Sequence, residues 1–188
     1  MKFSFMWVDK TLPKEHTVTG SKMNLREFAK LLSVTGYNGI EIMMGNPFMF
    51  DYEDVKNVIS ETNLQISQLC TGEFFNFYGL CLNHIDQDKY KEALLWAEEV
   101  INLASQFKCS MNIGRFRGKV WQDGHENSFD RMINSFKHLD QKAQEKKVTI
   151  LIEPLRKDIC DNLNSVLDTY NFLKKFGLQS FHLMIDTD

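Results

Sequence analysis

The sequence has no long apolar run, no low-complexity tract and little proline. Its 188 residues include only three prolines, and no segment approaches the about 20 consecutive apolar residues that a membrane-spanning helix needs. The apolar start at residues 3–8 meets Asp9 too soon to form the apolar core of a signal peptide. We therefore expect a cytoplasmic protein with no membrane partner.

Cysteine is scarce and widely spaced. The four cysteines are Cys70, Cys81, Cys109 and Cys160, and none belongs to a Cys-x-x-Cys pair. This spacing argues against both a disulfide framework and a thiolate zinc site. We expect reduced, buried thiols.

Excess positive charge is also absent. The formal net charge is −3 at pH 7, and no cluster of lysine and arginine is present that would attract a phosphate backbone or an anionic membrane. Nucleic acid is therefore not an expected partner. The hydrophobic fraction of 43% is that of an ordinary soluble protein, so the chain can form one apolar core.

Short apolar runs alternate with longer segments of helical periodicity. This alternation is typical of repeated βα units around a parallel sheet, and it predicts an α/β fold. We count six units in a single domain, with strands expected at residues 3–8, 39–43, 65–69, 110–113, 149–152 and 181–185.

Helices are expected between these strands. Asn24 and Glu27 have the spacing of a capping box, in which the two side chains satisfy free backbone amides at the start of a helix. Further helices are expected at residues 51–62 and 164–176, the second with Gly177 as its C-terminal stop. Two more carry an apolar face, formed by Tyr90, Leu94, Ala97, Ile101 and Ala104 in one and by Phe129, Met132, Ile133, Phe136 and Ala143 in the other.

Loop length differs sharply between the two ends of the expected sheet. Connections from a helix to the next strand are short, whereas those from a strand to the next helix are long, as at residues 9–23, 70–86 and 114–127. In parallel α/β folds the carboxyl ends of the strands build the functional site. We therefore expect the site at this elaborated end.

Two carboxylates fall at the ends of consecutive expected strands. With a period of two, Glu153 shares a face with Leu151, and Asp186 shares a face with Met184. Neighbouring parallel strands lie about 4.8 Å apart, so the two carboxylates are expected at the same position on adjacent strands. Such a pair is stabilised by a proton or by a cation between them. Two oxygen ligands favour Mg²⁺ or Mn²⁺, and an added imidazole would admit Co²⁺ or Zn²⁺.

An alternative for these carboxylates needs no metal. Glu153 would pair with Arg115, Arg117 or Arg156, and Asp186 would cap a loop. Pro154 favours the metal interpretation, because it ends the strand directly after Glu153 and leaves that side chain at the rim.

Three segments resemble the xylose-isomerase-like barrel superfamily of sugar and sugar-phosphate isomerases and epimerases. They are GYNGIEIM at residues 36–43, ILIEPL at 150–155 and LMIDT at 183–187, spread over most of the chain. The resemblance implies an incomplete (β/α)₈ TIM barrel with about six βα units and parallel strands.

The resemblance also implies a site and a reaction. Members of the superfamily bind one divalent metal through Glu, Asp, His and Glu side chains of late strands. Glu153 matches the first of these ligands and Asp186 the second, whereas the later His and Glu have no counterpart in the sequence. The implied reaction is metal-dependent proton transfer next to the carbonyl of a sugar or sugar phosphate through an enediolate, with Glu153 as metal ligand and as acid or base.

Four further residues are candidates for substrate contact. By resemblance Trp7 would stack on a sugar face and Glu41 would contact the substrate; the alternatives are a core tryptophan and a carboxylate that accepts backbone amides. Arg115 and Arg117 follow the fourth expected strand, where a forked guanidinium can bind a phosphate or a carboxylate, and the alternative is a solvated loop.

The chain is shorter than a closed barrel. A barrel of this kind needs about 250 residues, so the chain is roughly 60 residues short. The first and sixth expected strands would then be open edges with unpaired amides, which favour association with another chain. We therefore expect impaired catalysis and a homo-oligomer formed through the open edges; the alternative is that another polypeptide supplies the missing strands.

Two other functions are weighed against the isomerase. A partial barrel without activity would bind a ligand or a partner protein through its open edges. An abasic-site endonuclease would need histidines after early strands, and residues 70–72 and 112–114 contain none.

Overall fold

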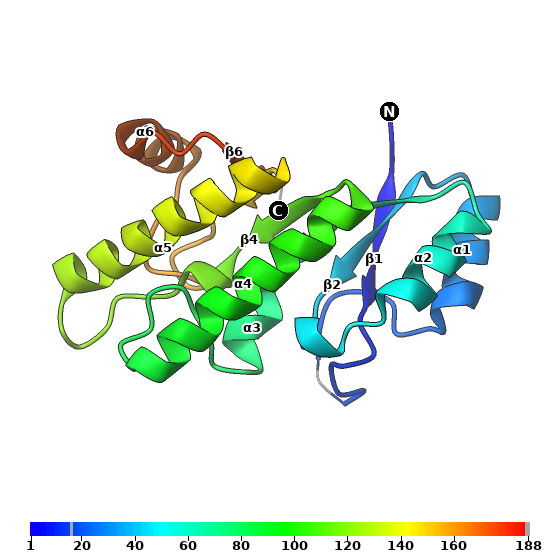
Figure 1. The fold of residues 1–188 in the computed structure, drawn as a ribbon, viewed down its shortest axis with the longest axis horizontal. Coiled ribbons are helices and arrows are strands. Elements are labelled where there is room, and N and C mark those ends of the chain that lie inside the picture. The colour runs from blue at the N-terminus through cyan, green and yellow to red at the C-terminus, as the bar shows by residue number, and fades with distance from the viewer. Residues whose placement is uncertain (16, 187–188) are drawn as a thin grey trace.

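The protein is built around one parallel β-sheet, seen in a computed structural model that describes residues 1–15 and 17–186 (Figure 1). The strands follow one another in sequence order across the sheet. They are β1 (Ser4–Val8), β2 (Gly39–Met43), β3 (Gln65–Cys70), β4 (Ser110–Ile113), β5 (Ile150–Ile152) and β6 (Phe181–Leu183). The six expected strands are therefore confirmed, with ends that differ by at most two residues. Thr187, the last residue of the third family-like segment, lies outside the described residues.

Helices connect the strands and pack against the sheet. They are α1 (Leu25–Val34), α2 (Tyr52–Ser60), α4 (Gln87–Phe107), α5 (His125–Lys146) and α6 (Val166–Phe176). Figure 1 shows α4 and α5 running in front of the strands, and α1 and α2 side by side at one end of the molecule. None of the helices in the described ranges is long and apolar enough to cross a membrane.

The ends of several helices follow from local sequence. The Oδ1 atom of Asn24 accepts hydrogen bonds from the backbone N–H groups of Arg26 and Glu27, so Asn24 caps α1 as predicted. Gly177 ends α6 with a φ of +64°, a left-handed conformation that glycine adopts without a steric penalty. The cap and the stop were both predictable because they depend on neighbouring residues only.

Short helices occupy the loops after three of the strands. They are the 3₁₀ helix η1 (Pro47–Met49) after β2, α3 (Gly72–Asn76) after β3 and the 3₁₀ helix η2 (Arg115–Arg117) after β4. The rings of Phe74 in α3 and Phe116 in η2 pack edge to face at 4.9 Å. The extra chain at the carboxyl ends of the strands is therefore folded and packed.

The strand register sorts side chains into a core row and an inner row. The core row, which faces the helices, contains Trp7, Ile42, Leu69, Met111, Ile150 and Phe181, and all six are buried. The inner row on the opposite face contains Val8, Met43, Cys70, Asn112, Leu151 and His182. His182 is exposed, because within residues 1–15 and 17–186 no strand follows β6 to close the sheet.

The free edge of β1 is partly covered by its own chain. The N–H of Val8 donates to the carbonyl of Ser21 at 2.9 Å, and the N–H of Ser21 donates to the carbonyl of Met6 at 2.8 Å. Ser21 thus forms a parallel bridge with Trp7. The expectation that β1 is an open edge is therefore wrong for its C-terminal half, because the loop after β1 folds back on the strand.

Candidate functional site

Glu153 lies directly after β5. It is two residues beyond Leu151 and therefore on the same inner face of the sheet. Its backbone N–H donates to the carbonyl of Ile113 at 3.4 Å, which extends the β4–β5 ladder. Its side chain is half-buried and reaches Gly114: the Oε2 atom lies 3.5 Å from the position that a Cβ atom on Gly114 would occupy. The carboxylate of Glu153 therefore lies beside Gly114, at a distance that is ordinary van der Waals contact for a Cβ atom.

The charge of Glu153 affects the neighbouring part of the inner face. Burial, and then the negative charges of Glu41 and Glu153, raise the pKa of the Cys70 thiol far above its usual range. Cys70 therefore stays protonated at neutral pH and is not a thiolate ligand or nucleophile. All four cysteines are free.

Asp186 follows β6, the strand next to the one that carries Glu153. β5 and β6 are hydrogen-bonded neighbours, so no strand separates the two carboxylates. The expectation that the two carboxylates occupy the same position on adjacent strands is wrong. Ile152 pairs with Leu183, so the register places Met184, and not Asp186, beside Glu153. Asp186 lies two residues further along the chain and is exposed.

The donor set that these two residues offer fits a hydrated ion. In residues 1–15 and 17–186, no three His, Cys, Asp or Glu side chains lie together where they would hold a metal. Mg²⁺ commonly binds one or two carboxylates and keeps several water ligands, whereas Zn²⁺ takes three or four protein ligands. The oxygen donors of Glu153 and Asp186 are of the type that Mg²⁺ and Mn²⁺ prefer.

The two candidate arginines have different surroundings. Arg115 is half-buried, and its Nη1 atom donates to Oδ1 of Asn76 at 3.0 Å. Arg117 is 0% exposed, and its guanidinium donates to backbone carbonyls and to Asn162. This placement differs from the expected anion-binding role of Arg117, because the side chain has no surface open to a ligand.

Glu41 is held by neighbouring strands. Its two carboxylate oxygens accept hydrogen bonds from Oγ of Ser4 at 2.9 Å and from Nε2 of Gln68 at 3.1 Å. The donors to Glu41 in these bonds are therefore side chains, and not the backbone amides considered as the alternative to substrate contact. Glu41 is half-buried on the inner face, and its charge and that of Glu153 both act on Cys70.

Trp7 lies on the opposite side of the sheet from Glu153. It belongs to the core row, is buried, and its Nε1–H donates to the carbonyl of Met23 at 3.0 Å. It lines a cavity of about 430 Å³, and neither Glu153 nor Asp186 lines it. The structure therefore does not bring Trp7 together with the two carboxylates.

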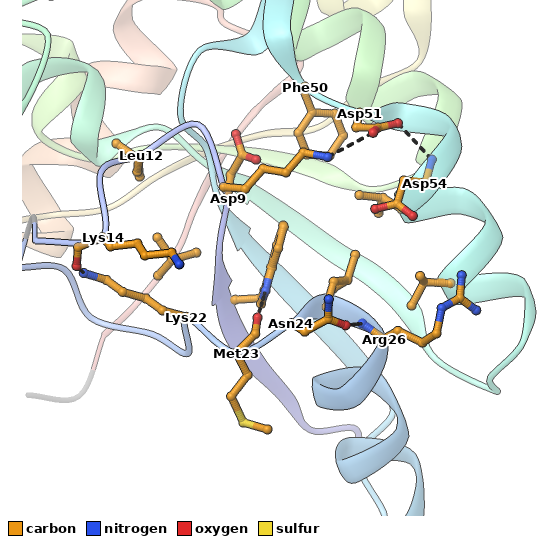
Figure 2. Close-up of a pocket in the computed structure, with 16 residues that line it drawn as sticks. Asp9, Leu12, Lys14, Lys22, Met23, Asn24, Arg26, Phe50, Asp51 and Asp54 are labelled. Atoms are coloured by element: carbon orange, nitrogen blue, oxygen red, sulfur yellow. Dashed lines mark hydrogen bonds and ion pairs between the residues drawn. The ribbon is translucent and has the colours of Figure 1, made fainter.

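Figure 2 shows this cavity, which lies around Asp9 at the carboxyl end of β1. Lys14 and Lys22 lie on one side of it, and Asp51 and Asp54 on the other. Lys10 pairs with Asp51 at 3.0 Å. The starts of α1 and α2 border the cavity, and Asn24 and Asp51 accept hydrogen bonds from amides in the first turns of these helices.

Asp9 is a buried carboxylate that the sequence patterns did not single out. It lies directly after β1, is 1% exposed, and accepts hydrogen bonds from the N–H of Gly45 at 3.2 Å and from the hydroxyl of Thr11. Burial raises the pKa of Asp9 above its ordinary value, although these hydrogen bonds act in the opposite direction. Its place after a strand was the available signal, the same one that identified Glu153.

The raised pKa of Asp9 predicts a pH-dependent contribution to stability. A carboxyl group whose pKa is raised by folding stabilises the native state fully below its unfolded pKa, and this contribution is lost as the pH rises through the folded pKa. The substituted asparagine carries no charge at either pH, so the free energy of unfolding of Asp9→Asn minus that of the wild type is expected to be larger at pH 7 than at about pH 3.5. Urea unfolding at both pH values measures the difference, and an equal difference at both would contradict the prediction.

A family model described as xylose isomerase-like TIM barrel matches residues 28–188. The match includes strands β2 to β6 and both carboxylates of the site. No curated protein sequence matches the chain.

Several solved structures share the fold. The chain is similar to 3-keto-D-glucoside 4-epimerase YcjR from E. coli, with a TM-score of 0.75 and 17% identity over 96% of this chain and 68% of that one. It is similar to D-allulose 3-epimerase from Methylomonas sp., solved with D-allulose, with a TM-score of 0.74 and 18% identity over 87% of this chain and 56% of that one.

A third similar structure is a xylose isomerase-like TIM barrel protein from Mycobacterium smegmatis, solved in complex with magnesium. Its TM-score is 0.59, with 17% identity over 86% of this chain and 56% of that one. Identities this low show a shared fold and leave function to be argued from the site. The chain spans between 56% and 68% of the length of these three proteins.

Proposed function

Because the chain belongs to the xylose isomerase-like TIM barrel family, we propose that it is a metal-dependent sugar or sugar-phosphate isomerase or epimerase. The proposal depends most on Glu153, a half-buried carboxylate on the inner face at the carboxyl end of β5, with Asp186 after the neighbouring strand. The similar epimerase solved with D-allulose supports a sugar substrate. The similar protein solved with magnesium supports a divalent cation.

The residues of this chain have defined roles in the proposed reaction. Glu153 and Asp186 would hold Mn²⁺ or Mg²⁺, and the cation, when bound, stabilises negative charge on substrate oxygens. Glu153 would take the proton from the carbon next to the carbonyl, since its carboxylate lies on the inner face, where the substrate would bind. Return of that proton to the neighbouring carbon of the enediolate completes an isomerisation, whereas epimerisation needs a second acid on the opposite face of the substrate.

Proton exchange tests the proposed reaction, because it requires only one acid or base. The purified chain, incubated with Mn²⁺ and a panel of ketoses in D₂O, is expected to replace the hydrogen next to the carbonyl with deuterium, and NMR measures the rate. Glu153→Gln should lower this rate by about 100-fold or more, because an amide does not accept the proton.

The control for this test is Glu126→Gln, which changes an exposed carboxylate at the start of α5. It should leave the exchange rate unchanged. The absence of exchange above that of Mn²⁺ alone would overturn the proposed activity. Tight binding to duplex DNA with an abasic site would instead favour an endonuclease.

Self-association is a second candidate property, and exposed apolar side chains at both ends of the sheet favour it. Leu31, Val34 and Phe5 are exposed near β1, and Leu167, Tyr170 and Ile185 are exposed near β6. We propose that these surfaces support a homo-oligomer. Light scattering tests this directly: a dimer without deuterium exchange would favour a binding protein over an enzyme, and a monomer at high concentration would contradict the oligomer.

A further inference from the structure

Arg117 is fully buried, and each of its five N–H groups has an oxygen acceptor. Nε donates to Oδ1 of Asn162 at 2.9 Å. Nη1 donates to the carbonyls of Gly114 at 3.0 Å and Glu153 at 2.8 Å. Nη2 donates to the carbonyls of Asn162 at 3.0 Å and Leu163 at 3.4 Å. The guanidinium therefore has no donor left for a ligand.

These acceptors belong to three segments that meet at the proposed site. Gly114 follows β4, Glu153 follows β5, and Asn162 and Leu163 precede α6. Because α6 leads directly to β6, the third segment is connected to the strand before Asp186. Arg117 thus joins the chain segments on which the two proposed metal ligands depend.

Both backbone polar groups of Glu153 are held in this arrangement. Its N–H donates to the carbonyl of Ile113, and its carbonyl accepts from Arg117. Fixing both peptide groups of a residue restricts its φ and ψ angles, and the backbone conformation in turn limits the side-chain rotamers. The bond from Arg117 therefore holds one of the two peptide groups that fix the backbone of Glu153.

The hydrogen bonds of Arg117 do not by themselves require a charged group at this position. All five acceptors are neutral oxygens, and the negative charges of Glu153 and Asp161 act on the buried guanidinium in addition to these bonds. Burying a charge costs free energy that hydrogen bonds only offset, and apolar replacements of buried ionic groups are often as stable. What a planar fork with five donors adds is a fixed geometry for several carbonyls at once.

We propose that Arg117 is a positioning residue for Glu153, which sets the direction in which the Glu153 carboxylate enters the site. This inference rests on the proposed function, because it assigns what orients the carboxylate that binds the cation and moves the proton. Arg117 itself touches neither cation nor substrate.

The first test measures the affinity for Mn²⁺ alone. Arg117→Lys keeps the charge but cannot reach all five acceptors, and it is expected to weaken Mn²⁺ binding by about 10- to 100-fold, the usual effect of losing a residue that orients a metal ligand. Asn162→Ala removes the acceptor of Nε, together with the bond from Nδ2 of Asn162 to the carbonyl of Gly118, and keeps the other four acceptors of Arg117, so a smaller loss of affinity is expected. In a Glu153→Gln background, Arg117→Lys should have no further effect.

The second test needs no metal. Three-bond scalar couplings measured by NMR report the χ1 rotamer of Glu153, which should be single in the wild type and averaged in both variants. Gly177→Ala, a remote change that also lowers stability, should retain the single rotamer. If Arg117 only stabilised the fold, its replacement would leave the χ1 rotamer of Glu153 in the folded protein unchanged.

The outcomes separate this inference from the proposed function. A single rotamer in the wild type that averages in Arg117→Lys supports the positioning role even if the wild type does not bind Mn²⁺, a result that would overturn the metal-dependent function. Unchanged rotamer and unchanged Mn²⁺ affinity in both variants would overturn the positioning role and leave the proposed function intact.

Discussion

Gly118→Ala is expected to lower the free energy of unfolding by about 4 kcal/mol. Gly118 has φ +94° and ψ −164°, a combination outside the left-handed helical region that other residues occasionally adopt. A Cβ atom at this position would overlap the side-chain amide of Asn83. The variant therefore combines backbone strain with a steric clash.

Asn83 cannot move away without losing its own hydrogen bonds. It is buried; its Nδ2 donates to the carbonyl of Lys119 at 2.7 Å, and its Oδ1 accepts from Nε1 of Trp121 at 3.1 Å. The carbonyl of Gly118 also accepts from Nδ2 of Asn162 at 3.0 Å, which links this turn to the acceptors of Arg117. A shift at Gly118 would therefore disturb the loops after β3, β4 and β5 together.

Gly177→Ala is the matched control for this prediction. Gly177 also has a positive φ, +64°, but no atom lies within 4 Å of the added Cβ. Its cost is expected to be about 1 kcal/mol, that of an ordinary residue in a left-handed conformation. Urea unfolding of both variants measures the difference, and equal losses would show that contact with Asn83 is unimportant.

Phe74→Ala is expected to destabilise the protein by about 4 kcal/mol. Phe74 is 0% exposed in α3, and its ring packs edge to face on Trp96 at 5.0 Å and on Phe116 at 4.9 Å. Removing the ring leaves a cavity between α3, α4 and η2, because two aromatic neighbours cannot both move into the space. The loops after β3 and β4 would then lose their main apolar contact.

The control is the same substitution at an exposed phenylalanine. Phe48 in η1 is 61% exposed, so Phe48→Ala should change the free energy of unfolding by no more than about 0.5 kcal/mol. Chemical denaturation monitored by circular dichroism compares the two variants. A small effect at Phe74 would mean that the loops collapse around the missing ring.

The features that were predictable from the sequence are those encoded by neighbouring residues. Strand and helix periodicity depends on a few consecutive side chains, and the Asn24 cap and the Gly177 stop depend on one turn of helix. The two faces of β5 and β6 followed in the same way, which placed Glu153 on the inner face.

The features that were missed depend on contacts between distant parts of the chain. Arg117 precedes a glycine in a loop with two arginines, a context that indicates exposure, and its burial requires acceptors 36 to 46 residues further along the chain. The level of Asp186 relative to Glu153 depends on the register of β5 and β6, which a period of two does not determine. The bridge between Ser21 and β1 likewise requires the fold of a long loop.

Titration of the purified chain with Mn²⁺, followed by electron paramagnetic resonance, tests the central claim that Glu153 and Asp186 hold one divalent cation. We expect one bound ion in the wild type, and at least about tenfold weaker binding in Glu153→Gln and in Asp186→Asn, because each variant removes one of two protein ligands. Glu126→Gln should bind like the wild type. Binding that is unchanged by Glu153→Gln, or no binding by the wild type, would contradict the account.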